Sequence, residues 1–162
     1  MVSPKSPKPA NAERRLSELG IELPLPPTPI GAYVESVQTG NLLYLSGILP
    51  VIGHKPKFVG RLGRQYNVEQ GREAARLAAL NVLSAARKHL GSLDNVTRVV
   101  KLTAYLATEE DFLELPKVAD AASELLRDVF GEDKLPVRMV LGVANLPLGV
   151  PVVLEVLFEV EA

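Results

Sequence analysis

The sequence of 162 residues contains no cysteine and no tryptophan, and aromatic residues make up only 5% of it. Without cysteine the chain can form no disulfide, no thiolate nucleophile and no cysteine-ligated metal centre. The formal net charge is −1, so no overall field attracts nucleic acid or an anionic membrane. Few aromatic rings are available for stacking on bases. The composition therefore argues against a dedicated nucleic-acid-binding protein.

The chain also lacks a long apolar run. No segment approaches the ~18 apolar residues that span a bilayer, so we expect no membrane span. Residues 1–10, MVSPKSPKPA, have no apolar core of the kind found in signal peptides. Together with the absence of cysteine, this predicts a cytoplasmic protein. The two histidines, His54 and His89, have no ligand cluster around them and no nucleotide-binding loop is present, so we expect no metal and no cofactor.

The length predicts one domain of 11–162 behind a disordered tail of 1–10, which is rich in proline, serine and lysine. Within the domain, 11–20 reads as a short helix with Asn11 as its N-cap. The segment 21–30 contains four prolines and is expected to be extended. We therefore expect 11–30 to form an N-terminal helix followed by a proline-rich extension.

The remaining pattern predicts alternating strands and helices. We expect a hairpin of strands 31–37 and 41–49, a short strand at 57–59, helices at 67–90 and 116–130, and strands at 96–107, 137–143 and 150–160. The order ββ(β)αβαββ predicts an α+β fold with two helices on one face of a sheet. The strands are apolar on both faces, which predicts that the other face packs on further subunits.

Charged residues are rare in the last two predicted strands. Arg138 stands alone in the first, and Glu155 lies in an apolar run of the second. A buried charge without a partner costs several kcal/mol, so Arg138 needs a partner or a function. The basic residues of the 51–64 loop, among them Arg61 and Arg64, favour a solvated loop, with an anion site as the alternative.

Three stretches resemble the reactive intermediate deaminase family (RidA or YjgF type), in its branch with a longer N-terminus. They are IGAYVESVQTGNLLYLSG at 30–47, LDNVTRVVK at 93–101, and PVR at 136–138 followed by VANLP at 143–147. The resemblance implies a chorismate-mutase-like fold that forms a homotrimeric barrel with ligand sites between subunits. It also implies hydrolysis of enamine and imine intermediates, such as 2-aminoacrylate and 2-iminobutanoate, to 2-keto acids and ammonia.

The resemblance assigns substrate-binding roles to three residues. Arg138 matches the arginine that holds the substrate carboxylate, and a planar guanidinium suits that task. Tyr33 and Ser46 match the tyrosine and serine of the cleft. The alternatives are that Arg138 pairs with a carboxylate at a subunit interface, that Tyr33 is a core aromatic, and that the Ser46 hydroxyl bonds to the backbone. The expected partners are a small carboxylate-bearing molecule and further copies of the chain.

Other positions depart from the family pattern. Val153 stands where the family's water-orienting glutamate is expected, and Glu155 matches the second glutamate of that strand. We take Glu155 as the candidate catalytic residue, with pairing to a cation as the alternative. Pro116 and Ile48 replace an asparagine and a glutamine. The sequence therefore predicts a RidA-like deaminase weakened at the water-orienting position. The alternatives are a non-catalytic regulatory trimer that binds small carboxylates and, with less support, an endoribonuclease or translation inhibitor.

Overall fold

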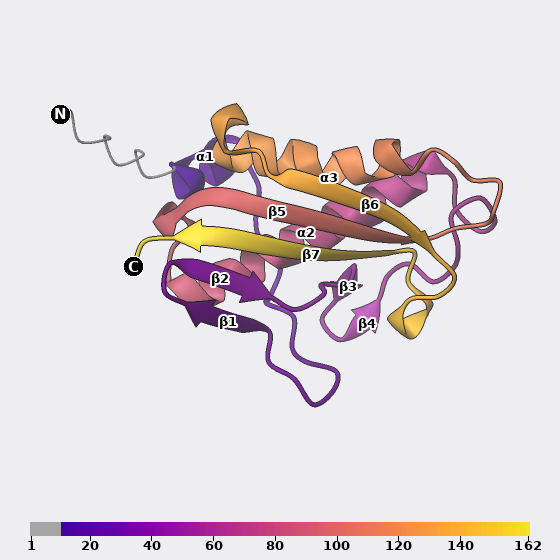
Figure 1. Cartoon of the computed structure of the whole chain (residues 1–162), viewed down its shortest axis with the longest axis horizontal. Helices are drawn as coiled ribbons and strands as arrows, with labels where there is room; N and C mark the ends of the chain where they lie inside the picture. The colour runs from indigo at the N-terminus through magenta and orange to yellow at the C-terminus, as the bar shows by residue number, and fades with distance from the viewer. Residues whose placement is uncertain (1–10) are drawn as a thin grey trace.

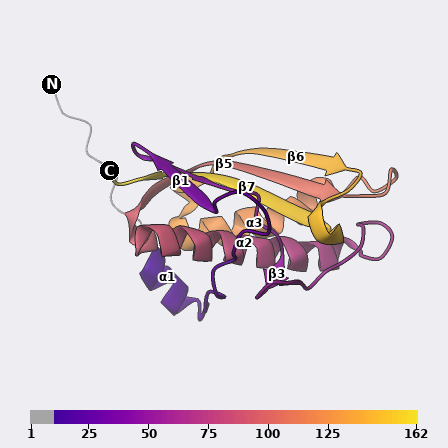
Figure 2. The same ribbon diagram turned by 90° about the horizontal axis from the view of Figure 1, so that it is seen from below.

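The computed structural model describes residues 11–162, so the predicted tail at 1–10 lies outside the described residues. A five-stranded sheet with the order β1-β2-β7-β5-β6 forms one layer. Helices α2 and α3 lie side by side against one face of this sheet, and α1 lies below them in Figure 2. None of the helices within 11–162 is long and apolar enough to cross a membrane.

The elements follow one another in the predicted order, as Figure 1 shows. The helices are α1 (Ala12–Glu18), α2 (Val68–Leu90) and α3 (Leu115–Phe130). The strands are β1 (Ser36–Thr39), β2 (Leu42–Leu45), β3 (Val51–Ile52), β4 (Lys55–Pro56), β5 (Val96–Ala107), β6 (Val137–Val143) and β7 (Val152–Val160). Short 3₁₀ turns lie at η1 (Leu93–Asn95), η2 (Glu132–Lys134) and η3 (Pro147–Gly149).

The α+β fold with two helices on one sheet face is confirmed. The strand expected at 57–59 is wrong: the chain instead forms the small β3–β4 hairpin just before it. Proline at position 56 can end a strand but cannot continue the hydrogen-bonded ladder within one. The hairpin strands β1 and β2 are also shorter than expected, because the chain before Ser36 bends out of the sheet.

Helix α2 is the centre of the core. Asn67 and Gln70 form a reciprocal capping box at its start, and Gly91 ends it with a left-handed backbone at φ 81°. Its buried face consists largely of alanines, which let a helix approach a sheet closely. The buried amide of Asn81 donates to the carbonyls of Leu49 and Val51, both at 2.9 Å. This bond ties the chain after β2 to the helix.

Helix α1 is held by a carboxylate rather than by its N-cap. Asn11 is the N-cap residue as predicted, and its carbonyl accepts from the Arg15 N–H at 3.0 Å, but its side chain makes no capping hydrogen bond. Glu13 instead accepts from Arg87 Nη2 at 2.7 Å and Nε at 3.1 Å, and from the Leu93 backbone N–H at 3.0 Å. Burial alone would raise the pKa of Glu13, but the hydrogen bonds from Arg87 and Leu93 outweigh it and hold that pKa below its ordinary value.

The strand register separates a covered face from an open face of the sheet. Leu102 of β5 is fully buried and lies opposite Val156 of β7 and Arg138 of β6, so these three positions face the helices. The alternate positions face away from the helices. They include exposed apolar side chains at Val37 (52%), Tyr44 (47%), Val137 (69%), Met139 (50%) and Leu141 (42%). We call these five residues the open-face patch.

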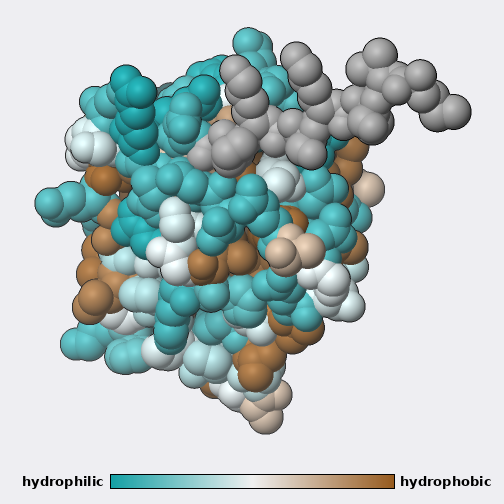
Figure 3. All heavy atoms as spheres, turned by 90° about the vertical axis from the view of Figure 1, so that its left-hand side faces the viewer, coloured by the Kyte–Doolittle hydropathy of each residue, from teal (hydrophilic) through white to brown (hydrophobic). Residues whose placement is uncertain are grey.

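Other parts of the surface have a different character. The end of the molecule that forms the left side of Figure 1 carries mostly hydrophilic residues, with apolar residues gathered in small groups (Figure 3). Scattered apolar residues are normal on a protein surface, whereas a contiguous apolar face of a sheet is typical of an interaction surface.

Candidate functional site

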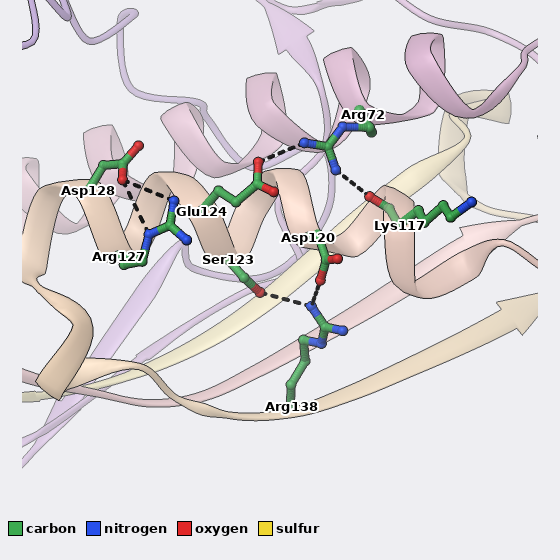
Figure 4. A network of polar contacts seen from close by, with 8 residues as sticks. All are labelled: Arg72, Lys117, Asp120, Ser123, Glu124, Arg127, Asp128 and Arg138. Carbon is green, nitrogen blue, oxygen red and sulfur yellow. Dashed lines mark hydrogen bonds and ion pairs between the residues drawn. The ribbon is translucent and has the colours of Figure 1, made fainter.

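The guanidinium of Arg138 has a partner within its own chain. Arg138 Nη1 donates to Asp120 Oδ1 at 2.7 Å and to Ser123 Oγ at 3.1 Å (Figure 4). Asp120 and Ser123 lie three residues apart on α3, on the side of the helix that faces β6. The charge predicted to need a partner therefore finds one on helix α3, which packs beside the edge strand β6.

The helix that carries this acceptor pair is itself fixed by a second arginine. Arg72 of α2 donates from Nη2 to Glu124 Oε2 at 2.6 Å and from Nη1 to the Lys117 carbonyl at 2.6 Å. Figure 4 shows this bridge on the far side of α3 from Arg138. The two bridges together hold α3 between α2 and β6, so the direction of the Arg138 side chain is determined by packed elements.

Tyr33 and Ser46 lie close together near the β1–β2 edge of the sheet, away from Arg138 on β6. The Ser46 hydroxyl donates to the Val34 carbonyl at 2.6 Å, and the Ser46 N–H donates to the Glu35 carbonyl at 2.9 Å. The Tyr33 hydroxyl accepts from the Ile30 N–H at 3.1 Å. Tyr33 is 42% exposed, so it is not the core aromatic offered as an alternative. Its ring stands at the surface.

Within one chain, Tyr33 and Ser46 lie far from Arg138. Ser46 follows β2, and two strands, β7 and β5, lie between β2 and β6. Three strand spacings correspond to roughly 14 Å, which is too far for a small molecule to contact both sides at once. A site that uses Arg138 together with Tyr33 and Ser46 therefore needs residues from two copies of the chain.

Glu155 and Val153 both lie on the open face of β7, opposite Thr103 and Tyr105 of β5. Glu155 is exposed and borders a hollow shared with Lys101 and Thr103. Val153 is only 7% exposed. A methyl group added at Gly47 would lie 3.1 Å from Val153 Cγ1, so Val153 fills the space beside the backbone that follows Ser46.

A pocket opens next to Tyr33, and we call it the Glu35 pocket. It encloses about 360 Å³ including its open mouth. It is lined by Pro27, Thr28, Ile30, Tyr33, Glu35, Gly47, Ile48, Leu49, Val51, Gly53, His54 and Leu148. Burial raises the pKa of the Glu35 carboxyl, and the positive charge of Lys88 opposes this only in part.

The basic loop before α2 has a structural role. The Arg61 guanidinium donates to the carbonyls of Ala144 and Thr108, and its Nε lies 3.4 Å from Glu109 Oε1. Arg64 Nη1 lies 3.9 Å from the same carboxylate oxygen. These contacts hold the Arg61 guanidinium within its own chain, whereas Arg64 remains 68% exposed. Within 11–162 no group of three histidine, aspartate or glutamate side chains could hold a metal ion.

Sequence reasoning missed two features of this region. The acceptors of Arg138 could have been found from the i, i+3 spacing of Asp120 and Ser123 on a predicted helix. Glu35 follows Tyr33 and Val34 directly in the sequence, but no pattern in one sequence indicates that its carboxyl is buried.

Comparison with known proteins agrees with this geometry. Residues 13–160 match the model of the family described as "YjgF/chorismate mutase-like, putative endoribonuclease". Protein TCP17 of Trypanosoma cruzi is 41% identical over 145 residues, covering 89% of this chain and 91% of that protein. A protein of Dermatophagoides farinae named 2-iminobutanoate/2-iminopropanoate deaminase is 30% identical over 143 residues, covering 87% of this chain and 95% of that protein.

Solved structures give the same result. The crystal structure of the protein Atu1372 from Agrobacterium tumefaciens superposes with a TM-score of 0.84 at 36% identity, covering 93% of this chain and 92% of that chain. The protein therefore belongs to the YjgF/RidA family of chorismate-mutase-like proteins.

Proposed function

We propose that this protein is a hydrolytic deaminase of small enamine and imine intermediates such as 2-aminoacrylate and 2-iminobutanoate. The products are a 2-keto acid and ammonia. A relative named 2-iminobutanoate/2-iminopropanoate deaminase, 30% identical over 143 residues, supports this proposal. The absence of cysteine fits a reducing compartment, and we propose a cytoplasmic location.

The observation that carries the proposal is the hydrogen bonding of the Arg138 guanidinium, which leaves one of its edges open. Both of its hydrogen bonds leave from Nη1, and within residues 11–162 no hydrogen bond is found for Nε or Nη2. Its side chain is 27% exposed. Asp120 and Ser123 therefore orient the guanidinium from one side, while its other edge retains N–H groups for a ligand carboxylate. Such planar donors bind a carboxylate with two parallel hydrogen bonds.

The active assembly in this proposal is a homotrimer. The open-face patch supports it, because an apolar sheet face on a water-soluble fold gains free energy when a second copy covers it. The separation of Arg138 from Tyr33 and Ser46 within one chain also supports it. A neighbouring copy would supply the second half of each site, so that every site lies between two subunits.

The proposed role of each residue follows from the chemistry of imine hydrolysis. Arg138 binds the substrate carboxylate, and Tyr33 and Ser46 orient the substrate at the facing subunit. A carboxylate must then direct water toward the imine carbon. Glu155 is the carboxylate of β7 available for this step, two residues from Val153 on the same face of the strand.

One observation favours a second candidate function, a trimer that binds small carboxylates without catalysis. Val153 is an apolar, nearly buried side chain packed beside Gly47, where the family resemblance places a water-orienting glutamate. Such a protein would keep the Arg138 anchor and lack the hydrolytic group. The hydrogen bonds of Arg61 to backbone carbonyls give no comparable support to RNA cleavage, because they hold this guanidinium within its own chain.

The test generates 2-iminobutanoate in situ with a threonine dehydratase and follows 2-ketobutyrate formation with and without the protein. A deaminase raises the rate above that in buffer, and Arg138→Ala abolishes the gain, whereas the exposed Arg14→Ala on α1 keeps it. If the wild-type protein gives no gain, the deaminase proposal is wrong. Saturable binding of 2-ketobutyrate that Arg138→Ala removes would then establish the second candidate.

A further inference from the structure

The Glu35 carboxyl is an exception among the buried polar groups. Its Oε2 is buried, and it is the only buried side-chain nitrogen or oxygen within residues 11–162 without a hydrogen-bond partner. Natural proteins rarely leave such an atom unpaired, because burial without a partner removes the hydrogen bonds that water would supply. The exception therefore needs an explanation, and a ligand is one.

The pocket around this carboxyl contains further polar groups. Tyr33 and His54 line it, with His54 Nδ1 2.9 Å from Thr28 Oγ1. Most of the remaining wall is apolar. An apolar pocket with a few convergent polar groups is the usual form of a small-molecule site. Lys88 is the charged group that acts on Glu35 from helix α2.

The backbone at one wall of the pocket is unusual. Leu148 has φ 57°, the only positive φ at a residue other than glycine within the described chain. A leucine rarely adopts this left-handed conformation, and such residues cluster at ligand sites. Here it places a leucine from the turn before β7 against the pocket formed by the segment before β1.

We infer that Glu35 is the residue that contacts the nitrogen of the ligand and exchanges protons with it, which makes Glu35, in place of Glu155, the acid–base catalytic residue of the proposed deaminase. Glu155 borders a different hollow, beside Lys101 and Thr103. This inference rests on the proposed function for its chemistry, and on the pocket for its geometry. A carboxyl whose pKa is raised by burial can donate a proton and then accept one, as general acid–base catalysis requires.

The reaction balances with Glu35 and one water. The Glu35 carboxyl first gives its proton to the imine nitrogen. Its carboxylate then takes a proton from water as the water oxygen bonds to the imine carbon, which gives a carbinolamine. The Glu35 proton next passes to the amine nitrogen, the carbon–nitrogen bond breaks, and the carboxylate takes the hydroxyl proton as the carbonyl forms. Ammonia and the keto acid leave, and Glu35 is protonated again.

The position of the pocket fits the departure at Val153. Gly47 lines the pocket, and a methyl group on Gly47 would come within 3.1 Å of Val153 Cγ1. The Glu35 carboxyl therefore approaches this part of the molecule from the segment before β1, whereas a carboxyl at position 153 would approach it from β7. The carboxyl that is missing at position 153 therefore has a candidate replacement in Glu35, which lines the same pocket as Gly47.

The experiment compares wild-type protein, Glu35→Gln and a control variant, Glu110→Gln, whose side chain is exposed in the turn before α3. The first measurement is turnover of 2-iminobutanoate made in situ. We expect Glu35→Gln to lower kcat/KM by about 10²- to 10⁴-fold, the range of general acid–base catalysis, and Glu110→Gln to change it little. Thermal unfolding of each variant verifies that the fold is retained.

The second measurement does not depend on turnover. Acetamidinium, a stable planar molecule with a protonated carbon–nitrogen double bond, is titrated and observed by saturation-transfer NMR. We expect saturable binding to the wild-type protein and to Glu110→Gln, and its loss in Glu35→Gln. If wild-type turnover is absent, the deaminase proposal fails, and this measurement alone decides whether Glu35 binds the ligand nitrogen. The inference is overturned if Glu35→Gln turns over 2-iminobutanoate within threefold of the wild-type rate. It is also overturned if Glu35→Gln binds acetamidinium as the wild-type protein does.

Discussion

Replacing Asp120 by asparagine should tighten the binding of a small carboxylate at Arg138. Asp120 Oδ1 lies 2.7 Å from Arg138 Nη1, and the two side chains are 47% and 27% exposed. Asparagine has nearly the same shape and still offers an oxygen to Nη1. The substitution therefore removes one negative charge while the orientation of the guanidinium, which Ser123 also supports, is retained.

The magnitude follows from the charges around one guanidinium. A ligand carboxylate on the free edge of Arg138 would lie about 6 Å from the Asp120 carboxylate, and at an effective dielectric constant of about 40 to 80 the two repel by about 0.7 to 1.4 kcal/mol. Removing this repulsion should lower the Kd by about three- to tenfold. Salt screens partly exposed charges, so the difference should shrink as ionic strength rises.

Isothermal titration calorimetry with 2-ketobutyrate at low and high salt measures this effect. Asp128→Asn is the matched control, because Asp128 lies on the same helix and is paired with Arg127 at 3.4 Å. The control should bind as the wild-type protein does. Equal or weaker binding by Asp120→Asn would refute the reasoning, since it would mean that Asp120 chiefly orients Arg138 or that the ligand carboxylate binds elsewhere.

Three further predictions concern stability, catalysis and assembly. Glu13→Gln should lower the free energy of unfolding by about 1 kcal/mol. Because Arg87 holds the pKa of Glu13 below its ordinary value of 4.5, this loss of stability should be complete above about pH 5 and should vanish as the pH falls through the folded-state pKa. Chemical denaturation at several pH values measures it. Val153→Glu should raise deaminase kcat/KM by about tenfold or more and lower the Tm, since it places a charge where the side chain is 7% exposed; an unchanged rate contradicts it. Met139→Glu should leave monomer stability within about 0.5 kcal/mol but abolish self-association in sedimentation velocity, and a persisting oligomer would show that the open-face patch is not the interface.

The sequence by itself determined the elements whose signals are local. The capping box of Asn67 and Gln70 and the apolar period that follows fix α2, and Gly91 ends it as expected. The strands 96–107 and 137–143 appear with the predicted bounds, because segments rich in valine and leucine favour the strand conformation. The motifs from Ile30 to Gly47 and around Arg138 were enough to identify the family.

Tertiary structure decided everything that depends on which face a side chain takes. The strand with Arg138 is apolar on both faces, so its alternation does not say which face is covered. The register of β6 on β5 settles this by placing Arg138 opposite the buried Leu102. That side faces α3, where Asp120, 18 residues away in the chain, supplies the partner.

The same holds for the Glu35 pocket. Its walls come from the proline-rich segment, the β3–β4 hairpin and the turn at Leu148, which lie as much as about 120 residues apart in sequence and meet only because β7 returns beside β2. The burial of the Glu35 carboxyl therefore depends on how these segments pack together and not on the residues next to Glu35 in the sequence. A single sequence therefore predicted an arginine anchor, and only the folded chain revealed the buried carboxylate oxygen with no partner.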